Sequence, residues 1–461
     1  MKSYDLIVIG SGPGGYVAAI RASQLGMQAA VVEEDELGGV CLNWGCIPTK
    51  SILHAAEQFD AVQSGVAGLI VEGLRADYGA VIDASRKAAQ RLNRGVGSLM
   101  KKNQIDVLKG RGALAGSGQV VVRDGESETL YQAANIVLAT GSTEFVFPGI
   151  QVDGRRVLTS REALESRELP ESLLIIGGGA VGLEFAYAYA CYGVKVTIVE
   201  MQPQLLPGFD TETAAELARS FTRRGIEVAT STAYKGLEAN GSGVVVGVEG
   251  EKGEKELVAD QVLLAVGRKA LIEGVGLEAN GVEIERGFVR VDEQQRTTAP
   301  GVWAIGDCAG PPLLAHAASH EGVAAVEFMA GERRHPIDAR RIPGNIYCQP
   351  QVGSIGWSEE QARAAGHEVQ VGKVPFLASG KAVGTGHTEG FVKLVADAQY
   401  GEVLGCQIIG HGATEMINEV ALAMTLECTV AELAEACHAH PTLSEMLAEA
   451  ALACEDRSIN F

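Results

Sequence analysis

The 461-residue sequence lacks the usual features of membrane, secreted and nucleic-acid-binding proteins. No apolar run reaches the ~20 residues that a membrane-spanning helix requires, and the first residues, MKSYDLIVIG, do not form a signal-peptide pattern. Basic residues are scarce: 38 Lys and Arg stand against 58 Asp and Glu, a net charge of −20 that disfavours nucleic acids and anionic membranes as partners. We therefore expect a cytoplasmic protein with a solvated acidic surface.

Cysteine is also scarce, with nine residues, an odd number that does not suit a disulfide-stapled secreted protein. Two of them, Cys41 and Cys46, lie five positions apart in the glycine-rich run GGVCLNWGCIPTK. On an ideal helix their Cα atoms would be roughly 8 to 9 Å apart, whereas a disulfide needs about 4.4 to 6.8 Å. A bridge therefore requires a bent backbone, which Gly45 permits. Two unrelated buried thiols are the alternative.

A dinucleotide-binding pattern opens the chain. The apolar run from Tyr4 to Ile9 predicts a strand, and Gly10, Gly12 and Gly15 then form GxGxxG before a helical pattern. This context provides a tight turn, close approach to a pyrophosphate and helix N-terminal amides that face the anion. Glu33 ends the next apolar run, 23 residues after Gly10, where a carboxylate can accept hydrogen bonds from a ribose.

The same pattern occurs a second time, with Gly177, Gly179 and Gly182 after a strand and Glu200 again 23 residues beyond the first glycine. Apolar runs close the two copies at Thr140-Gly141 and at Gly267. The first copy spans 131 residues from its first glycine to its closing glycine and the second spans 90, and the cysteine pair lies in the longer one. Two nucleotide folds, one enlarged around a cysteine pair, indicate electron transfer between two cofactors.

Glu200 also bears on the choice of nicotinamide. A carboxylate at this strand end suits a free ribose 2′-hydroxyl and repels a 2′-phosphate, which would require arginine. No basic residue follows until well downstream. The sequence therefore favours NAD over NADP.

From about Arg341 the pattern changes to strands followed by helices, which is typical of an α+β domain. We expect helices over Thr414–Leu426 and Val430–Ala436, and a long helix earlier in the chain over Tyr78–Asn103. The tail holds the segment HAHPTLSE, from His438 to Glu445.

The cysteine segment, both glycine motifs, the run VWAIGDCAG and the segment HAHPTLSE together resemble the pyridine nucleotide–disulfide oxidoreductases, over essentially the full chain. The resemblance implies a redox-active Cys41–Cys46 disulfide beside a flavin. Cys41 would exchange with substrate and Cys46 would contact the flavin. Thiol–disulfide exchange needs a base near neutral pH, and a carboxylate can fix the tautomer of a histidine. His440 would be that acid/base, oriented by Glu445, while His438 would be structural.

The resemblance also implies the two cofactor sites and the assembly. FAD would occupy the first site and NAD the second. Lys50 and Glu184 would form an ion pair beside the flavin. The plainer alternative is that Lys50 is a surface charge and Glu184 an ordinary helix residue. The implied FAD contacts are Gly10, Gly12, Gly15, Glu33, Lys50, Thr140, Gly141, Asp307 and Ala315; the implied NAD contacts are Gly177, Gly179, Gly182, Glu200 and Gly267. The C-terminal domain would form a homodimer in which each site takes its cysteines from one subunit and its histidine from the other. No metal is expected, and the remaining cysteines, Cys308 included, receive no redox role.

We thus predict an α/β fold with two Rossmann-like dinucleotide-binding domains and a C-terminal α+β dimerisation domain. The expected boundaries are 1–150 for FAD, 151–270 for NAD, 271–340 for a central domain that completes the FAD site, and 341–461 for dimerisation. The implied activity is oxidation of a dihydrolipoyl group with NAD⁺, on a lipoyl-bearing domain of a 2-oxo-acid dehydrogenase or glycine-cleavage assembly.

The alternatives share the scaffold. Glu200 disfavours a glutathione-type reductase that uses NADPH, and a mercuric reductase would carry a C-terminal cysteine pair where this tail has only Cys454. Transhydrogenase-type relatives lack a complete redox pair. A non-catalytic flavin-binding subunit would be free to lose the cysteines, His440 or Glu445, yet all are present.

Overall fold

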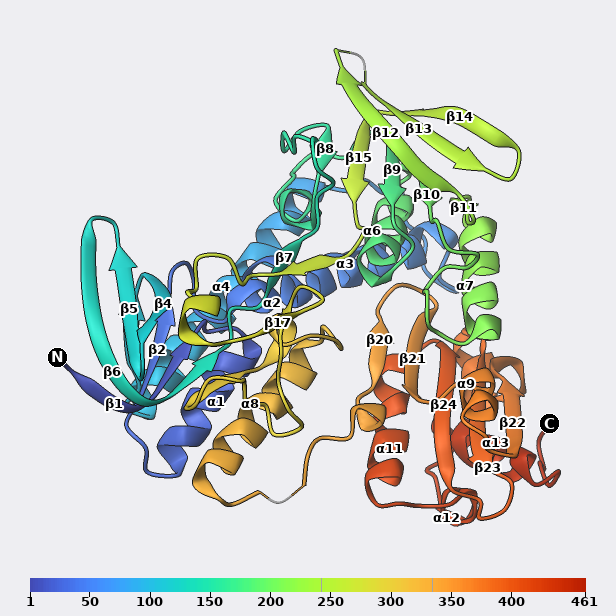
Figure 1. Ribbon diagram of the computed structural model, residues 1–461. Coiled ribbons are helices and arrows are strands. Elements are labelled where there is room, and N and C mark those ends of the chain that lie inside the picture. Colours follow the sequence, from blue (N-terminus) through green and yellow to red (C-terminus); the bar gives the residue numbers. More distant parts are fainter. Residues whose placement is uncertain (242, 334) are drawn as a thin grey trace.

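The computed structural model describes residues 1–241, 243–333 and 335–461. Figure 1 shows three parts, each built on its own sheet: an N-terminal part in blue with gold elements from residues 270–330, a green part above it, and an orange-red C-terminal part. A mixed sheet with a parallel centre, a parallel sheet and an antiparallel sheet, each packed with helices, confirm the predicted fold class. Within the described ranges, no helix is long and apolar enough to cross a membrane.

The first sheet is parallel at its centre. Its strands run in the order β3 (Asp106–Lys109), β2 (Ala29–Glu33), β1 (Ser3–Ile9) and β6 (Ser127–Leu138), and β19 (Val302–Ala304) pairs with the end of β6. Antiparallel strands β4 (Arg111–Gly116) and β5 (Gln119–Asp124) extend it along the other end of β6. The parallel strands end together, so the loops after β1 and β6 meet at one edge, where a nucleotide binds in such folds.

Helices α1 (Pro13–Gln24) and α8 (Ala315–Ala330) pack side by side on this sheet. Glycine allows the close contact: a Cβ on Gly14 would lie 2.9 Å from the Ala318 carbonyl oxygen, and one on Gly322 would lie 2.6 Å from the Gly14 carbonyl oxygen. Segment 271–340 thus adds β19 and α8 to the first sheet and shares its hydrophobic core. The domain boundaries themselves stay a prediction.

The second sheet is parallel throughout, in the order β11 (Glu227–Ala229), β10 (Lys195–Val199), β9 (Ser172–Ile176), β15 (Gln261–Leu264) and β8 (Val157–Leu158). Helices α6 (Ala180–Cys191) and α7 (Thr211–Arg223) belong to this part. Strands β12 (Ala233–Asn240), β13 (Gly243–Gly250) and β14 (Gly253–Ala259) form a separate antiparallel sheet, which the sequence patterns did not predict.

The third sheet is antiparallel, in the order β20 (Gly344–Ile346), β21 (Gln351–Gly356), β24 (Val403–Gly410), β23 (Phe391–Asp397) and β22 (Val369–Pro375). Helices α11 (Ala413–Thr425), α12 (Val430–Glu435) and α13 (Glu445–Cys454) share its hydrophobic core. The two predicted helices here agree with α11 and α12 to within a residue or so.

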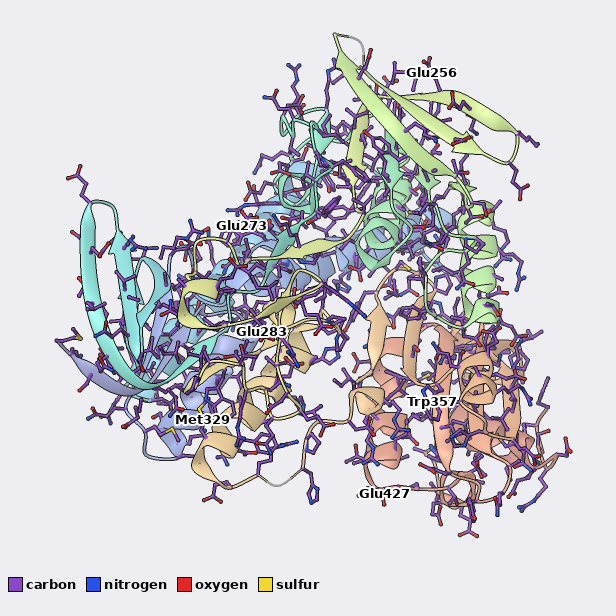
Figure 2. The ribbon with its side chains drawn as sticks, viewed as in Figure 1. Glu256, Glu273, Glu283, Met329, Trp357 and Glu427 are labelled. Atoms are coloured by element: carbon purple, nitrogen blue, oxygen red, sulfur yellow. A yellow bond between two sulfur atoms is a disulfide. The ribbon has the colours of Figure 1, made fainter. Side chains whose placement is uncertain are left out.

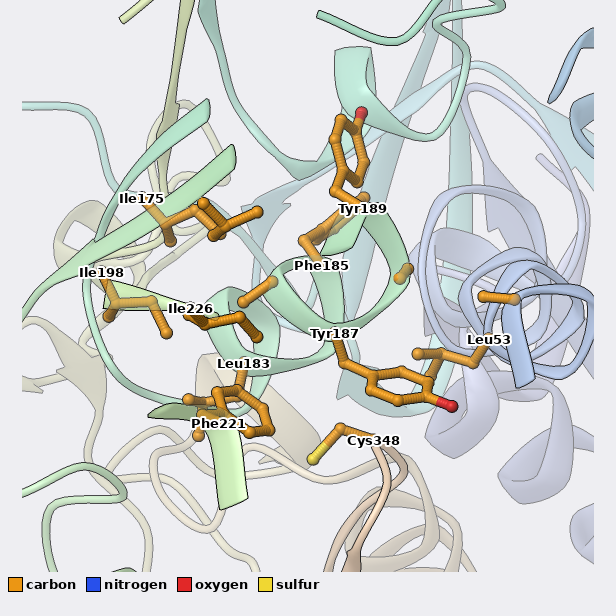
Figure 3. Packing of buried hydrophobic residues seen from close by; sticks show 14 of the residues in the cluster. Leu53, Ile175, Leu183, Phe185, Tyr187, Tyr189, Ile198, Phe221, Ile226 and Cys348 are labelled. Atoms are coloured by element: carbon orange, nitrogen blue, oxygen red, sulfur yellow. The ribbon is translucent and has the colours of Figure 1, made fainter. Parts of the chain in front are cut away.

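Helices α2 (Gly39–Trp44), α3 (Cys46–Ser64) and α4 (Tyr78–Lys102) follow β2; Cys41 lies in α2, and Cys46 begins α3, which runs from the first part toward the green part. One hydrophobic cluster joins all three parts: it contains Leu53 of α3, Leu183 and Tyr187 of α6, and Cys348 of the C-terminal part (Figure 3). Burial of this cluster fixes the position of α3 against both neighbours.

Acidic side chains lie on the outside of the three parts, as expected for a solvated acidic surface; examples are Glu256, Glu273, Glu283 and Glu427 (Figure 2).

Candidate active site

A Cys41–Cys46 disulfide joins the middle of α2 to the start of α3. Gly45 separates the two helices with φ −145° and ψ −114°, and this bend brings the two Cα atoms to 4.7 Å. A Cβ at Gly45 would lie 3.1 Å from the Val40 carbonyl oxygen, so the bend also leaves little room for a side chain. The bend predicted at Gly45 is confirmed, and the alternative of two unrelated thiols is wrong.

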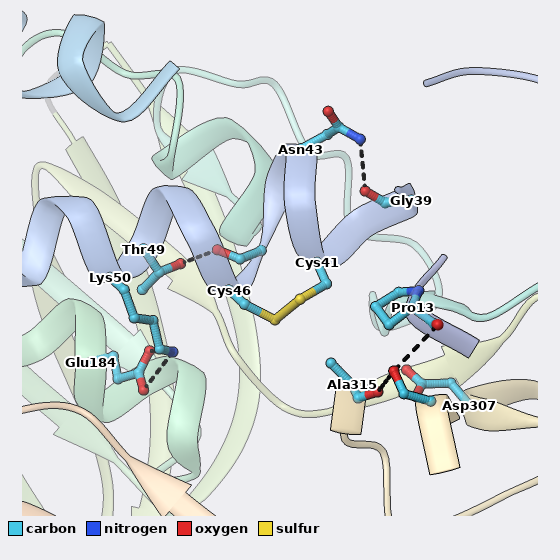
Figure 4. The surroundings of a disulfide bond; sticks show 12 residues. Pro13, Gly39, Cys41, Asn43, Cys46, Thr49, Lys50, Glu184, Asp307 and Ala315 are labelled. Carbon is cyan, nitrogen blue, oxygen red and sulfur yellow. Dashed lines mark hydrogen bonds and ion pairs between the residues drawn. A yellow bond between two sulfur atoms is a disulfide. The ribbon is translucent and has the colours of Figure 1, made fainter. Parts of the chain in front are cut away.

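Lys50 lies one helical turn beyond Cys46 and forms an ion pair with Glu184 of α6 (Figure 4). Its Nζ donates to Oε1 at 3.0 Å and to Oε2 at 2.8 Å. The Glu184 side chain is only 6% exposed, whereas that of Lys50 is 34% exposed. The ion pair that the resemblance implied is therefore present, at the end of α3 that carries Cys46. Its place beside a flavin stays a prediction.

The first glycine turn has the geometry of a dinucleotide cradle. A Cβ on Gly10 would lie 2.2 Å from the Ala139 carbonyl oxygen, and one on Gly15 would lie 2.0 Å from the Gly10 carbonyl oxygen. At Gly12, by contrast, no described atom lies within 4 Å of that position. Gly12 also caps α1 without any side-chain hydrogen bond among the described residues, so the first-turn amides can bind a pyrophosphate. Glu33 accepts from the backbone N–H of Ser11 at 3.1 Å.

The second turn repeats this geometry. Cβ atoms on Gly177 and Gly182 would each lie 2.2 Å from a carbonyl oxygen, whereas the one on Gly179 would meet no described atom within 4 Å. Glu200 is buried, and its carboxylate accepts from the backbone N–H groups of Gly178 at 2.6 Å and Gln202 at 2.7 Å. These two bonds hold a negative charge beside the turn, where a nucleotide ribose lies in such folds.

Asp307 joins the first cradle through a network that sequence reasoning missed. Ser142, directly after Gly141, donates to the Asp307 carboxylate, and Arg268, directly after Gly267, donates from Nε to Ser142 Oγ at 2.6 Å. Strands β7 (Ser142–Glu144) and β16 (Arg268–Ala270) pair here. The closing turns of the two nucleotide folds are therefore in contact. The sequence offered one signal for this network: Ser142 and Arg268 each directly follow a closing glycine.

Ala315 begins α8, and Ser319, one turn further along, contacts α1: its Oγ lies 3.0 Å from the Ala315 carbonyl oxygen and 3.3 Å from that of Pro13. Leu314 caps α8 without a side-chain hydrogen bond in the described part of the chain. Figure 4 shows Pro13, Asp307 and Ala315 on the side of the disulfide away from Lys50 and Glu184. The disulfide thus lies between the first cradle and the ion pair.

His440 is oriented but exposed. Its Nδ1 lies 2.8 Å from Glu445 Oε1, and the other carboxylate oxygen accepts from the Thr442 N–H at 2.7 Å. The Thr442 amide and His440 together lower the pKa of Glu445 below its ordinary value. The His440 side chain is 77% exposed, and none of the hydrogen bonds or ion pairs of the described residues joins it to the cysteine segment of its own chain. His438, in contrast, is largely buried and contacts Glu419 at 2.6 Å.

The other thiols are mostly buried. Burial raises the pKa of Cys191 and of Cys454 to about 12 and raises that of Cys308. Such thiols are unreactive at neutral pH. Cys437 is the exposed one among the free cysteines of the described residues.

The chain is similar to known proteins over nearly its full length. Residues 4–322 match the pyridine nucleotide-disulphide oxidoreductases, and residues 342–451 match the dimerisation domain of that family. Dihydrolipoyl dehydrogenases of Zymomonas mobilis and Chlorobaculum tepidum are 45% and 47% identical to this chain, covering 99% and 97% of it and 99% and 96% of their own lengths.

Solved structures show the same architecture. LpdA from Mycobacterium tuberculosis has a TM-score of 0.90 at 27% identity, covering 98% of this chain and 99% of its own. The flavoprotein disulfide reductase RclA from Escherichia coli has a TM-score of 0.86 at 26% identity, covering 97% and 99%. The chain belongs to the pyridine nucleotide-disulphide oxidoreductase family.

Proposed function

We propose that this chain oxidises dihydrolipoyl groups to lipoyl groups, with NAD⁺ as the final electron acceptor and the Cys41–Cys46 disulfide as the first. The activity is that of a dihydrolipoyl dehydrogenase, which its full-length relatives carry as their name. The observation that carries the proposal is the position of the disulfide, between the glycine cradle, whose helix has no side-chain cap among the described residues, and the Lys50–Glu184 ion pair (Figure 4).

In the proposed reaction a dihydrolipoyl thiolate attacks Cys41, breaks the disulfide and leaves Cys46 as a thiolate. The second substrate thiol then displaces Cys41 and closes the lipoyl disulfide, so that two electrons now reside on the cysteine pair. His440 of the partner subunit would take the substrate thiol's proton, since its imidazole is exposed and its tautomer is held by Glu445. The chemistry that FAD supplies when bound is acceptance of this electron pair and its delivery to NAD⁺ as hydride.

We propose the following residues for the two cofactors, because the open positions at Gly12 and Gly179 leave room for a pyrophosphate at each turn. For FAD these are Gly10, Gly12, Gly15, Glu33, Lys50, Thr140, Gly141, Asp307 and Ala315; for NAD they are Gly177, Gly179, Gly182, Glu200 and Gly267. The match of residues 342–451 to a dimerisation domain supports a homodimer, and a lipoyl-bearing domain of a larger assembly is the proposed protein partner.

The test is an assay of NAD⁺ reduction with dihydrolipoamide. Parallel assays follow NADPH oxidation with glutathione disulfide and with Hg²⁺. Of these three substrates, we expect only dihydrolipoamide to be turned over. Cys46→Ser should lose turnover and the long-wavelength band that dithiol induces, while Cys428→Ser, a half-buried thiol outside the site, should keep both. Full lipoamide turnover by Cys46→Ser, or a spectrum of the wild-type protein that dithiol leaves unchanged, would contradict the proposal.

A further inference from the structure

A short segment of the dimerisation domain lies against the helix that carries the redox cysteine. It comprises residues 347–349, between β20 and β21. The ring of Tyr347 has the Nζ of Lys50 4.3 Å from its centre, and Gln349 Nε2 donates to Glu57 Oε1 at 2.9 Å. Lys50 and Glu57 are seven residues apart on α3 and so lie two turns apart on one face. The segment therefore contacts α3 at two points along one side.

Tyr347 contacts both members of the Lys50–Glu184 pair. Its ring faces the ammonium group, and its backbone N–H donates to Glu184 Oε1 at 3.1 Å. The neighbouring Cys348 is fully buried in the cluster that contains Leu53 and Tyr187 (Figure 3). This anchor fixes the backbone of the segment, so the position of the Tyr347 ring is determined by the dimerisation domain.

We propose that Tyr347 is a positioning residue for electron transfer, which holds the Lys50 ammonium group in place through its ring face. The inference rests on the proposed function, in which Lys50 and Glu184 lie beside the flavin. Tyr347 would be a third member beside Lys50 and Glu184, and it would link this ion pair to the domain that supplies His440 to the partner subunit.

The ring matters because Lys50 is a flexible side chain that is one-third exposed. Without the ring, the two Glu184 oxygens are the remaining polar partners of the Lys50 ammonium group among the described contacts. They fix the distance of the ammonium group from Glu184 better than the direction in which it points. A cation held over an aromatic face gains an attraction equivalent to roughly 2- to 30-fold in population. An ammonium group fixed beside a bound flavin would favour negative charge on it and would thereby raise its reduction potential.

The matched variants are Tyr347→Phe and Tyr347→Leu. Phenylalanine keeps the ring face and the backbone N–H, and loses only a hydroxyl that lies 3.5 Å from Asn345 Nδ2. We expect Tyr347→Phe to stay within about twofold of wild type, and Tyr347→Leu to lower kcat roughly 2- to 30-fold with little change in the KM for dihydrolipoamide. The flavin reduction potential, measured by dye equilibration, should fall in Tyr347→Leu and not in Tyr347→Phe.

Two controls separate positioning from loss of structure. The melting temperatures of the two apoprotein variants should be similar, and Tyr347→Leu should have no further effect on the potential in a Lys50→Met background, because the ring acts through Lys50. Equal potentials for Tyr347→Leu and Tyr347→Phe, or additive effects with Lys50→Met, would overturn the inference. Because the potential is measured without a lipoyl substrate, it decides the role of Tyr347 even if the dihydrolipoamide assay fails.

Discussion

Glu445 holds the Nδ1 of His440 at 2.8 Å, while the imidazole ring itself is exposed to solvent. Both carboxylate oxygens are used, one by the histidine and one by the Thr442 amide. With Nδ1–H held in this way, Nε2 is free to accept a proton. Glu445 thus orients the base within one chain, and no hydrogen bond or ion pair of the described residues joins His440 to the cysteines of that chain.

Glu445→Gln should lower kcat/KM for dihydrolipoamide by about 10- to 100-fold, since a charged hydrogen bond is lost. Glutamine keeps one acceptor oxygen where glutamate uses two, so either the histidine or the Thr442 amide loses its partner. Because the pKa of Glu445 is lowered, its carboxylate stays charged as the pH falls to the ordinary pKa of a glutamate. The carboxylate stops orienting His440 only at a still lower pH.

Glu419→Gln, at the partner of His438, is the control and should change melting temperature more than kcat/KM. Wild-type kcat/KM in Glu445→Gln would show that the histidine needs no orienting group.

Glu200 should make NAD strongly preferred over NADP, because a 2′-phosphate would meet a buried carboxylate with no neighbouring cation in residues 201–211. Glu200→Gln keeps the shape and removes the charge, and should reduce the NAD:NADP ratio of kcat/KM about tenfold or more. Glu33→Gln, the equivalent change in the first cradle, should leave that ratio unchanged. Comparable efficiency of the wild-type protein with both nicotinamides would contradict the assignment.

Lys393 of β23 forms an ion pair with Asp210 at 3.0 Å, and both side chains are almost fully buried. Lys393→Met leaves the Asp210 carboxylate without its cation and should cost about 3 to 5 kcal/mol in the free energy of unfolding. Lys373→Met removes an exposed pair with Glu212 and should cost about 1 kcal/mol or less. Chemical unfolding of the wild type and the two variants measures these two costs. Equal unfolding midpoints for Lys393→Met and Lys373→Met would show that the buried ion pair stabilises no more than the exposed one.

The pH dependence of that difference follows from the same contacts. Burial alone would lower the Lys393 pKa, but hydrogen bonds to Glu212 and Asp210 raise it above its ordinary value, so the lysine's contribution is lost only as the pH rises through that raised value. Glu212, whose pKa Lys393 lowers, loses its contribution only in acid. The penalty of Lys393→Met should therefore be nearly constant from about pH 5 to pH 10.

Local chemistry explains which features could be predicted from sequence. The glycine turns, the bend at Gly45 and the helix over Tyr78–Lys102 follow from backbone freedom and periodicity within a few residues. Strand β22 was not predicted because Gly372 interrupts its apolar pattern, yet a Cβ there would lie 1.8 Å from the Ala450 carbonyl oxygen of α13. The contacts of Tyr347, Arg268 and Lys393 join residues more than a hundred positions apart, so no local pattern encodes them.

The shared site is tested most directly by mixing two inactive chains, Cys41→Ala and His440→Ala. Each alone should retain little activity: Cys41→Ala removes the thiol that exchanges with substrate, and loss of the base in His440→Ala costs ~10² to 10⁴ in rate. A hybrid dimer holds one site with both defects and one with neither, and random exchange makes about half the dimers hybrids by the symmetry of pairing. With subunit exchange verified by two affinity tags, the mixture should recover roughly a quarter of wild-type activity. An exchanged mixture that stays inactive would show that His440 serves the cysteines of its own chain and would contradict the account.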